Sequence, residues 1–219
     1  MNIEELYNLY YNHTRNREYH EALDLIKRKI KDFKAQEILL NVIAKTLNNL
    51  QTYHEKGYKK ISAFQILAAA KIAKDVIKIL GPKLEKELER KDEGPKGDKI
   101  IIGNIFQDHH GMGKEIVKTL LLANGYQVID LGLDIPASKF VSEAIKEDAK
   151  YIFVSAMMYS TSLGIKNIKR ELLKQNRSDI KVIAGGAPFK YNENLYKKVE
   201  ADHIASEPQE ILKILKNYD

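Results

Sequence analysis

An aspartate, a histidine and a glycine follow an apolar run in the second half of this 219-residue chain. They are Asp108, His110 and Gly113, in the spacing D-x-H-x-x-G directly after residues 99–105. A metal-ligating imidazole usually donates its second ring N–H to a carboxylate, which sets its tautomer and basicity. Asp108 and His110 can form such a pair on a loop, and Gly113 lets a bulky ligand approach the backbone. The spacing predicts a metal ligand at His110, with a plain surface turn as the alternative for so short a motif.

Short apolar runs alternate with amphipathic segments from residue 99 onward. The predicted strands cover residues 99–105, 127–131, 150–155, 180–184 and 202–205, and helical spacing of apolar residues marks the segments that follow them. Such alternation is typical of a parallel sheet covered by helices on both faces. It predicts a flavodoxin-like α/β domain with strand order 2-1-3-4-5, whose ligands bind beyond the carboxyl ends of strands 1 and 3.

Polar or glycine-rich residues are predicted to lie together at that edge of the sheet. Asp108 to Gly113 follow the first strand, Ser155 ends the third, and Gly185 and Gly186 end the fourth. Taken singly, Ser155 is equally explained as a helix cap, and Gly185 with Gly186 as a tight turn. Their common placement at one edge favours a single ligand site.

With these residues the chain resembles the corrinoid-binding proteins of cobalamin-dependent methyl transfer, over nearly its whole length. The resemblance rests on D-x-H-x-x-G with a following Lys114, on residues 130–141, on Ser155, and on the run Gly185–Pro188. It implies that the cofactor is cobalamin, passing between cob(I)alamin and methylcobalamin. It also implies a base-off, histidine-on state, with His110 as lower ligand of cobalt, Asp108 on the far ring nitrogen, and Ser155 hydrogen-bonded to Asp108.

The same resemblance implies a channel for the displaced nucleotide tail, lined by Gly113, Ser155, Gly185 and Gly186. His109 is the alternative ligand, but the spacing to Gly113 favours His110. Departures from the family pattern are Gln107 for glycine, Met157 for leucine, Tyr159 for a small hydroxyl residue and His203 for glycine. The complete set of expected cofactor-binding residues is Asp108, His109, His110, Gly111, Met112, Gly113, Ser155, Met157, Tyr159, Gly185, Gly186, His203 and Tyr58.

Residues 1–90 show helical spacing of apolar residues instead. Helices are predicted near residues 3–13, 17–33, 35–56 and 61–80, which together make a four-helix bundle. A polar, Pro- and Gly-containing linker is expected at 91–98, before a cobalamin-binding domain at 99–219. By resemblance the bundle is a cap over the upper face of the corrin. Tyr53, Tyr58 and Phe64 are candidates for its aromatic lid, with ordinary core packing as the alternative.

The resemblance implies a corrinoid methyl carrier. Such a protein is a non-catalytic subunit that shuttles a methyl group from a substrate-specific methyltransferase to an acceptor methyltransferase, and a reductive activator is a further expected partner. No acid or base for activating a methyl donor is evident in the sequence. The alternatives are a cobalamin-dependent sensor acting through a partner, which the absence of tryptophan disfavours, and a flavodoxin-like domain with another cofactor or none.

Composition agrees with these expectations. The net charge is +6 and the pI about 9.1, but lysines alternate with glutamates through both halves, so they predict solvated helix faces and no nucleic-acid partner. The chain has no cysteine, which excludes disulfides and thiolate metal sites. There is no signal-peptide pattern and no apolar run of membrane-spanning length, so we expect a cytoplasmic protein without a membrane partner.

Overall fold

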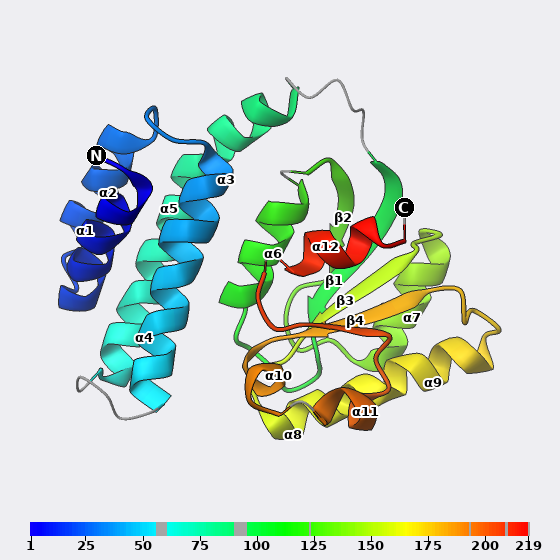
Figure 1. Cartoon of the computed structure of the whole chain (residues 1–219). Coiled ribbons are helices and arrows are strands. Elements are labelled where there is room, and N and C mark those ends of the chain that lie inside the picture. The colour runs from blue at the N-terminus through cyan, green and yellow to red at the C-terminus, as the bar shows by residue number, and fades with distance from the viewer. Residues whose placement is uncertain (56–60, 90–95, 123, 193, 209, 219) are drawn as a thin grey trace. The chain divides into compact units, whose positions relative to one another are not determined.

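The computed structural model describes residues 1–55, 61–89, 96–122, 124–192, 194–208 and 210–218. The chain divides into two compact units, Met1–Asp92 and Glu93–Asp219 (Figure 1). The predicted linker at 91–98 falls largely on residues outside the described ranges. No helix in those ranges is both long and apolar enough to cross a bilayer.

The first unit is helical. Its elements are α1 (Ile3–Asn16), α2 (Tyr19–Lys29), α3 (Ala35–Glu37), the π-helical η1 (Ile38–Ala44), α4 (Lys45–Glu55) and α5 (Ala63–Glu89). A capping box starts α1, because Asn2 and Glu5 each accept a hydrogen bond from the other's backbone N–H. Helices α1, α2 and α4 all pack against α5. The core buries the apolar residues expected from the helical spacing, including Leu23, Ile26, Leu39, Val42, Ile43 and Leu50.

Helix α5 is longer than predicted. The sequence placed its end near residue 80, yet it continues through Gly81 and Pro82 to Glu89. A proline inside a helix removes one hydrogen bond and normally ends or kinks the helix. Beyond it, the Lys83 amine donates to two carbonyls of the loop between α2 and α3, and the Glu87 carboxylate accepts from the Ala35 amide at 3.1 Å. These tertiary contacts outweigh the local signal, so the predicted end was wrong.

The second unit contains the parallel sheet that the sequence predicts. Its strands are β1 (Lys96–Asn104), β2 (Tyr126–Asp130), β3 (Tyr151–Ser155), β4 (Lys181–Gly185) and β5 (His203–Ala205). The order β2-β1-β3-β4-β5 confirms the flavodoxin-like prediction. In the register, Asn104 lies opposite Ser155, Ser155 opposite Gly185, and Gly185 opposite Ala205. The carboxyl ends of four strands therefore form one edge.

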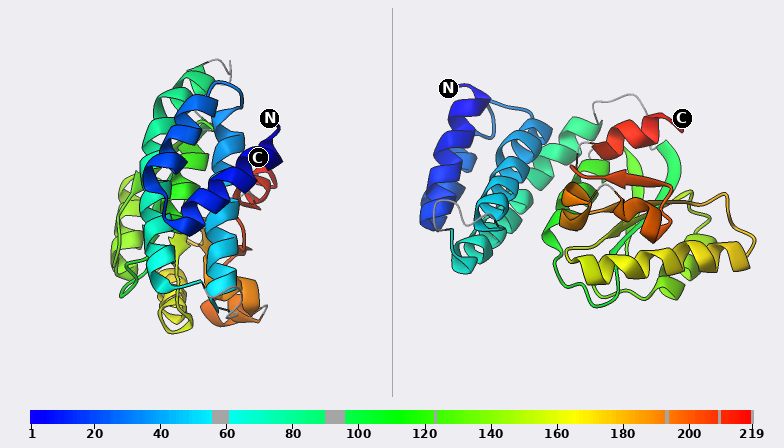
Figure 2. Two further views of the ribbon diagram at one scale, coloured as in Figure 1. Left: turned by 90° about the vertical axis from the view of Figure 1, so that its left-hand side faces the viewer. Right: turned by 60° about the horizontal axis from the view of Figure 1, so that its bottom comes forward.

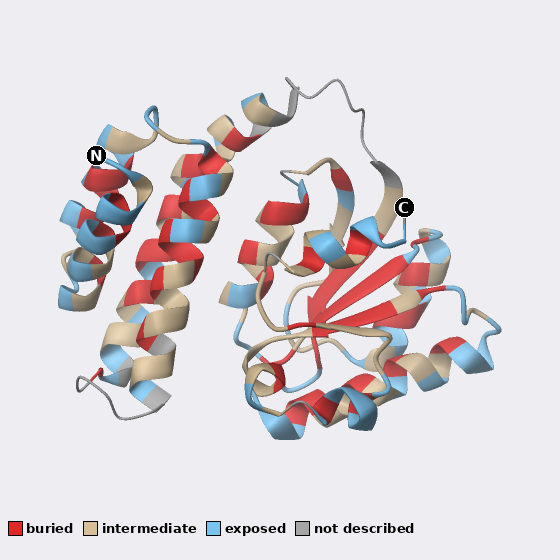
Figure 3. Cartoon of the chain, viewed as in Figure 1, coloured by how far each residue is buried: buried red, intermediate tan, exposed pale blue. Residues whose placement is uncertain are grey.

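Helices cover both faces of this sheet, as Figures 2 and 3 show. They are α6 (Met112–Leu122), α7 (Ala137–Lys146), α8 (Tyr159–Ser162) with the 3-10 turn η3 (Leu163–Ile165), α9 (Lys166–Lys174), α10 (Ala187–Tyr191), α11 (Leu195–Val199) and α12 (Glu210–Lys216). One face buries Ile100, Ile102, Phe153 and Ile183 with Leu121, Ile211 and Leu215 of α6 and α12. The other buries Ile101, Ile152 and Val182 with Phe140, Ile168 and Leu172 of α7 and α9.

Candidate functional site

Asp108 is the centre of the site at the carboxyl edge of the sheet. It is fully buried, just after β1. Its Oδ1 accepts from the His110 amide at 2.9 Å, from the Asn104 Nδ2 at 3.2 Å and from His110 Nδ1 at 3.3 Å. Its Oδ2 accepts from the amide of Met157. Hydrogen-bond donors on β1, on the loop after it and on the loop after β3 therefore hold this buried carboxylate in one orientation.

His110 has the arrangement expected of a metal ligand whose second nitrogen is held by a carboxylate. Nδ1 lies on Asp108, and the side chain is 55% exposed. In the described part of the chain, Nε2 has no protein partner. No group of three or more histidine, cysteine, aspartate or glutamate side chains able to hold a bare metal ion occurs among the described residues. A single imidazole fits a metal that brings most of its own ligands, as the cobalt of a corrin does.

His109 does not share this geometry. It is exposed, and its carbonyl accepts from the Gly111 amide at 3.2 Å. Of the two adjacent histidines, the structure places only His110 with a ring nitrogen on Asp108, as the spacing to Gly113 suggests.

The predicted hydrogen bond from Ser155 to Asp108 is not formed among the described residues. Ser155 ends β3 directly opposite Asn104, but the partners of the carboxylate are Asn104, His110 and the Met157 amide. Met157 was predicted to bind the cofactor, but the group that contacts Asp108 is its backbone N–H. Asn104 was not predicted, although a polar side chain at the end of an apolar strand is a signal that the sequence contains.

The glycines at the edge serve two different purposes. A Cβ on Gly113 would meet nothing within 4 Å, whereas one on Gly111 would lie 2.9 Å from Leu133 Cδ2. A Cβ on Gly185 would lie 3.1 Å from the Ala205 carbonyl oxygen, and one on Gly186 only 2.0 Å from that of Ala156. Close packing within the protein thus accounts for three of the four, and open space beside the chain is left at Gly113.

Replacing Gly113 with alanine separates its role in folding from its role in binding. Because α6 continues through this position without a clash, we expect the cofactor-free protein to gain up to about 1 kcal/mol of stability. If the ligand passes close to Gly113, an added methyl should weaken cobalamin binding about tenfold or more, the cost of modest overpacking. Urea unfolding and titration with hydroxocobalamin measure the two effects.

Gly81→Ala is the matched control, since Gly81 also lies inside a helix with nothing within 4 Å of its added Cβ. It should leave cobalamin affinity unchanged. Equal affinities of the wild type and Gly113→Ala would show that the ligand does not approach this backbone.

Two strained residues shape the loops around the site. Gln107 has φ of 65° and Asp134 has φ of 60°, in the left-handed region that glycine tolerates best. The Gln107 amide donates to Asp134 Oδ1 at 2.7 Å, and the Asp134 amide donates to the Asp108 carbonyl at 3.1 Å. These bonds hold in place a backbone conformation that favours glycine, and they tie the loop after β2 to the loop that carries His110.

A buried ion pair fixes the start of α6. The Lys114 side chain is 3% exposed, and its amine lies 2.5 and 2.6 Å from the two Asp130 oxygens, while Lys118 approaches Asp130 at 2.9 Å. Burial alone would raise the pKa of the Asp130 carboxyl, but hydrogen bonds from Lys114, Lys118 and the Gly132 amide outweigh it and hold that pKa below its usual range. These charged side chains pair with one another, which explains the cluster without a bound ligand.

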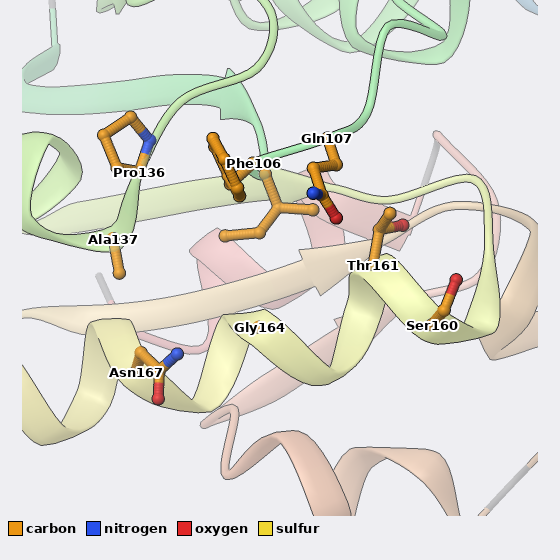
Figure 4. Close-up of a pocket in the computed structure, with 9 residues that line it drawn as sticks. Phe106, Gln107, Pro136, Ala137, Ser160, Thr161, Gly164 and Asn167 are labelled. Atoms are coloured by element: carbon orange, nitrogen blue, oxygen red, sulfur yellow. The ribbon is translucent and has the colours of Figure 1, made fainter.

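A cavity of about 280 Å³ lies beside the loop that carries His110. Figure 4 shows Ser160 and Thr161 of α8 with Asn167 of α9 on one wall, facing the loop residues Phe106 and Gln107. Ile105, Pro136, Ala137 and Gly164 complete the lining. Exposed apolar side chains lie on the loops that meet at Asp108, namely Phe106, Leu133 and Met158, and Tyr159 adds another at the start of α8.

The remaining predicted residues are placed as follows. Met112 begins α6, and the Tyr159 hydroxyl accepts from the Lys198 amine at 3.1 Å. The structure does not bring His203 to the others, because it pairs with Ile183, two residues before the strand edge, and its ring bonds to the Tyr218 hydroxyl. Tyr58 lies outside the described residues. A direct role of these side chains in cofactor binding stays a prediction.

Known proteins resemble this chain in sequence over much of its length. The sequence family described as the B12 binding domain matches residues 98–215. Dimethylamine corrinoid protein 3 of Methanosarcina acetivorans is 31% identical over 170 residues, covering 77% of this chain and 76% of that protein. Monomethylamine corrinoid protein 1 of the same organism is 33% identical over 157 residues, covering 70% of each.

Several solved structures share the fold. The monomethylamine corrinoid protein of Methanosarcina barkeri aligns with a TM-score of 0.83 over 99% of both chains, at 24% identity. The methanol:cobalamin methyltransferase complex of the same organism aligns with a TM-score of 0.52 at 20% identity, covering 98% of this chain and 79% of that one.

Proposed function

Because this chain belongs to the family of corrinoid proteins built on the B12 binding domain, with cobalamin as cofactor, we propose that it is a methyl carrier. It would hold cobalamin with the cofactor's own base displaced and His110 as the lower ligand of cobalt. The observation that carries this proposal is the pairing of His110 Nδ1 with the buried Asp108, on an exposed ring whose Nε2 has no partner among the described residues.

The chemistry of the pair follows from its contacts. Four donor contacts orient the Asp108 carboxylate. Asp108 in turn favours the His110 tautomer with its proton on Nδ1, and a carboxylate on the far nitrogen makes an imidazole a more basic ligand. When bound, the cobalt of the corrin supplies the atom that accepts and releases the methyl group.

The surroundings of His110 suit a large flat ligand. Phe106, Leu133 and Met158 expose apolar surface on the loops that converge on Asp108, and Tyr159 does so at the start of α8. We propose them as the surface on which the macrocycle lies, since large exposed apolar side chains on converging loops suit a binding surface. The open space at Gly113 would admit the displaced nucleotide tail.

The helical unit is proposed as the cap for the upper face of the cofactor. Phe64 and Leu67 lie three residues apart, and therefore on one side of α5, and their side chains are 75% and 66% exposed. When large apolar side chains are this exposed in the chain alone, they suggest a surface that is covered in the functional state. Phe64 is one of the lid candidates named from the sequence.

The proposed partners are methyltransferases. The relatives reported above are named for monomethylamine and dimethylamine, so we propose a methylamine as the source of the methyl group, delivered by a separate methyltransferase. A second methyltransferase would pass it to an acceptor, and a reductive activator would restore the cofactor after accidental oxidation.

Reconstitution tests the carrier role. The full chain is loaded with cobalamin, reduced, and mixed with a methylamine methyltransferase encoded in the same genome and either monomethylamine or dimethylamine. We expect the visible spectrum to change to that of the methylated cofactor in stoichiometric amount, and to revert when an acceptor methyltransferase and a thiol acceptor are added. A protein that binds cobalamin tightly but is methylated by none of these enzymes, and changes oligomeric state on binding, would act as a sensor.

A further inference from the structure

Asn104 is a buried polar residue that neither the sequence motif nor the proposed ligand set uses. It ends β1, and its side chain is fully buried. Its Nδ2 donates to Asp108 Oδ1 and to the carbonyl oxygen of His110, both at 3.2 Å. One amide group therefore links the end of β1 to the Asp108 carboxylate and to the backbone of the proposed cobalt ligand.

The orientation of this amide follows from its neighbours. Nδ2 faces a carboxylate oxygen and a carbonyl oxygen, both of which only accept hydrogen bonds. If the amide were turned over, Oδ1 would face those two oxygens and all three groups would repel. The observed orientation is thus the only one that satisfies both acceptors.

Asn104 lowers the stability of the fold when its effect on folding alone is considered. Its Oδ1 is buried and has no hydrogen-bond partner among the described residues. An unpaired buried acceptor costs free energy, and an apolar side chain of the same size would avoid that cost. Retaining an amide here is understandable if its two donated bonds serve the site.

We propose that Asn104 is a positioning residue for His110. By binding Asp108 Oδ1 and the His110 carbonyl, it fixes the carboxylate against the loop, so that His110 keeps its proton on Nδ1 and presents a bare Nε2. It occupies the place that resemblance assigned to Ser155, with the difference that an amide can bind the carboxylate and the loop at the same time. This inference rests on the proposed role of His110 as the ligand.

The first test uses the protein without cofactor. Ring-nitrogen NMR of ¹⁵N-histidine-labelled protein, at a pH where the rings are neutral, reports which nitrogen of His110 carries the proton. We expect Nδ1–H in the wild type, a mixture of both tautomers in Asn104→Leu, and partial recovery in Asn104→Thr, whose hydroxyl can donate one bond. A wild-type ring protonated on Nε2, or a tautomer unchanged in Asn104→Leu, would overturn the proposal.

Leu172→Ala controls for loss of stability. Leu172 is a fully buried residue of α9, so its truncation destabilises the same unit by creating a cavity. We expect it to leave the His110 tautomer as in the wild type. A tautomer shift in this variant equal to that in Asn104→Leu would mean that general loosening, and not the amide of Asn104, is responsible.

The second test separates this inference from the proposed function. After loading with hydroxocobalamin and reduction to the Co(II) state, EPR shows splitting by an axial nitrogen, and labelling histidine with ¹⁵N shows whether it comes from the protein. We expect a histidine signal in the wild type, and in Asn104→Leu a weaker one with about tenfold lower affinity, the lower end for loss of an outer partner. No histidine signal in the wild type would refute the proposed ligand, whereas equal signals and affinities in both proteins would refute only the role of Asn104.

Discussion

Replacing His110 with alanine is expected to remove the histidine-on state of the bound cofactor completely. Among the described residues, His110 is the side chain with one ring nitrogen on Asp108 and a second ring nitrogen without a protein partner. Loss of an outer partner of a ligand costs about 10–100-fold in affinity, so loss of the ligand itself should cost at least about 100-fold. The visible spectrum of the loaded variant should be that of base-off cobalamin with no nitrogen from the protein.

His109→Ala is the matched control. His109 adjoins His110 but is exposed, and only its carbonyl is engaged, by the Gly111 amide. We expect its spectrum and affinity to equal those of the wild type. If His109→Ala lost the histidine-on spectrum while His110→Ala kept it, the ligand would be assigned to the wrong residue. His109→Ala changes an exposed side chain that does not bind Asp108, so its stability in urea should stay within about 0.5 kcal/mol of the wild type. His110→Ala also removes one hydrogen bond to the buried Asp108 carboxylate, so it should lose about 1–3 kcal/mol.

The sequence predicts the part of the site whose residues are close together along the chain. Asp108 and His110 are two residues apart on one loop, so their spacing alone brings them together. The strand order was predictable as well, because the alternation of apolar runs and helices restricts the topology to a few choices. Gly113 could be recognised for the same reason, since it lies five residues after Asp108 in the same segment of the chain.

Contacts between distant segments were not predictable. Asp108 Oδ2 is bound by the amide of Met157, 49 positions away, and every residue except proline has such an amide. Helix α5 extends past Pro82, against the local helix-breaking signal, because Lys83 binds the Phe33 carbonyl, 50 positions earlier, and Glu87 binds the Ala35 amide at the start of α3, 52 positions earlier. The short helices α10 and α11 contain too few residues to show a helical period.

Gly185 and Gly186 were correctly singled out from the sequence, but the reason why glycine is needed there was predicted only in part. The sequence offered two explanations, a tight turn or room for a nucleotide tail. The structure gives a steric reason within the protein, because a Cβ at either position would meet a backbone oxygen of a neighbouring segment. Their expected role in lining a channel for the nucleotide tail stays a prediction.

The steric reason makes Gly186→Ala one of the most damaging single substitutions available in this unit. Gly186 has φ of 117° and ψ of 179°, a conformation essentially restricted to glycine, and its added Cβ would lie 2.0 Å from the Ala156 carbonyl oxygen. Backbone strain of about 1–3 kcal/mol adds to the cost of moving the strand ends apart, so we expect a loss of more than about 3 kcal/mol. Urea unfolding, followed by circular dichroism, measures it.

Gly185→Ala provides the comparison within the same turn. Its Cβ would lie 3.1 Å from the Ala205 carbonyl oxygen, a contact that a shift of a few tenths of an ångström relieves, and its φ is not in the positive range. We therefore expect a loss of about 1–2 kcal/mol, in line with modest overpacking. Because Ala156 directly precedes Met157, whose amide binds Asp108, the larger displacement in Gly186→Ala should also disturb the Asp108–His110 pair. Equal and small losses in the two variants would show that the Gly186 backbone does not approach Ala156 as closely as the structure indicates.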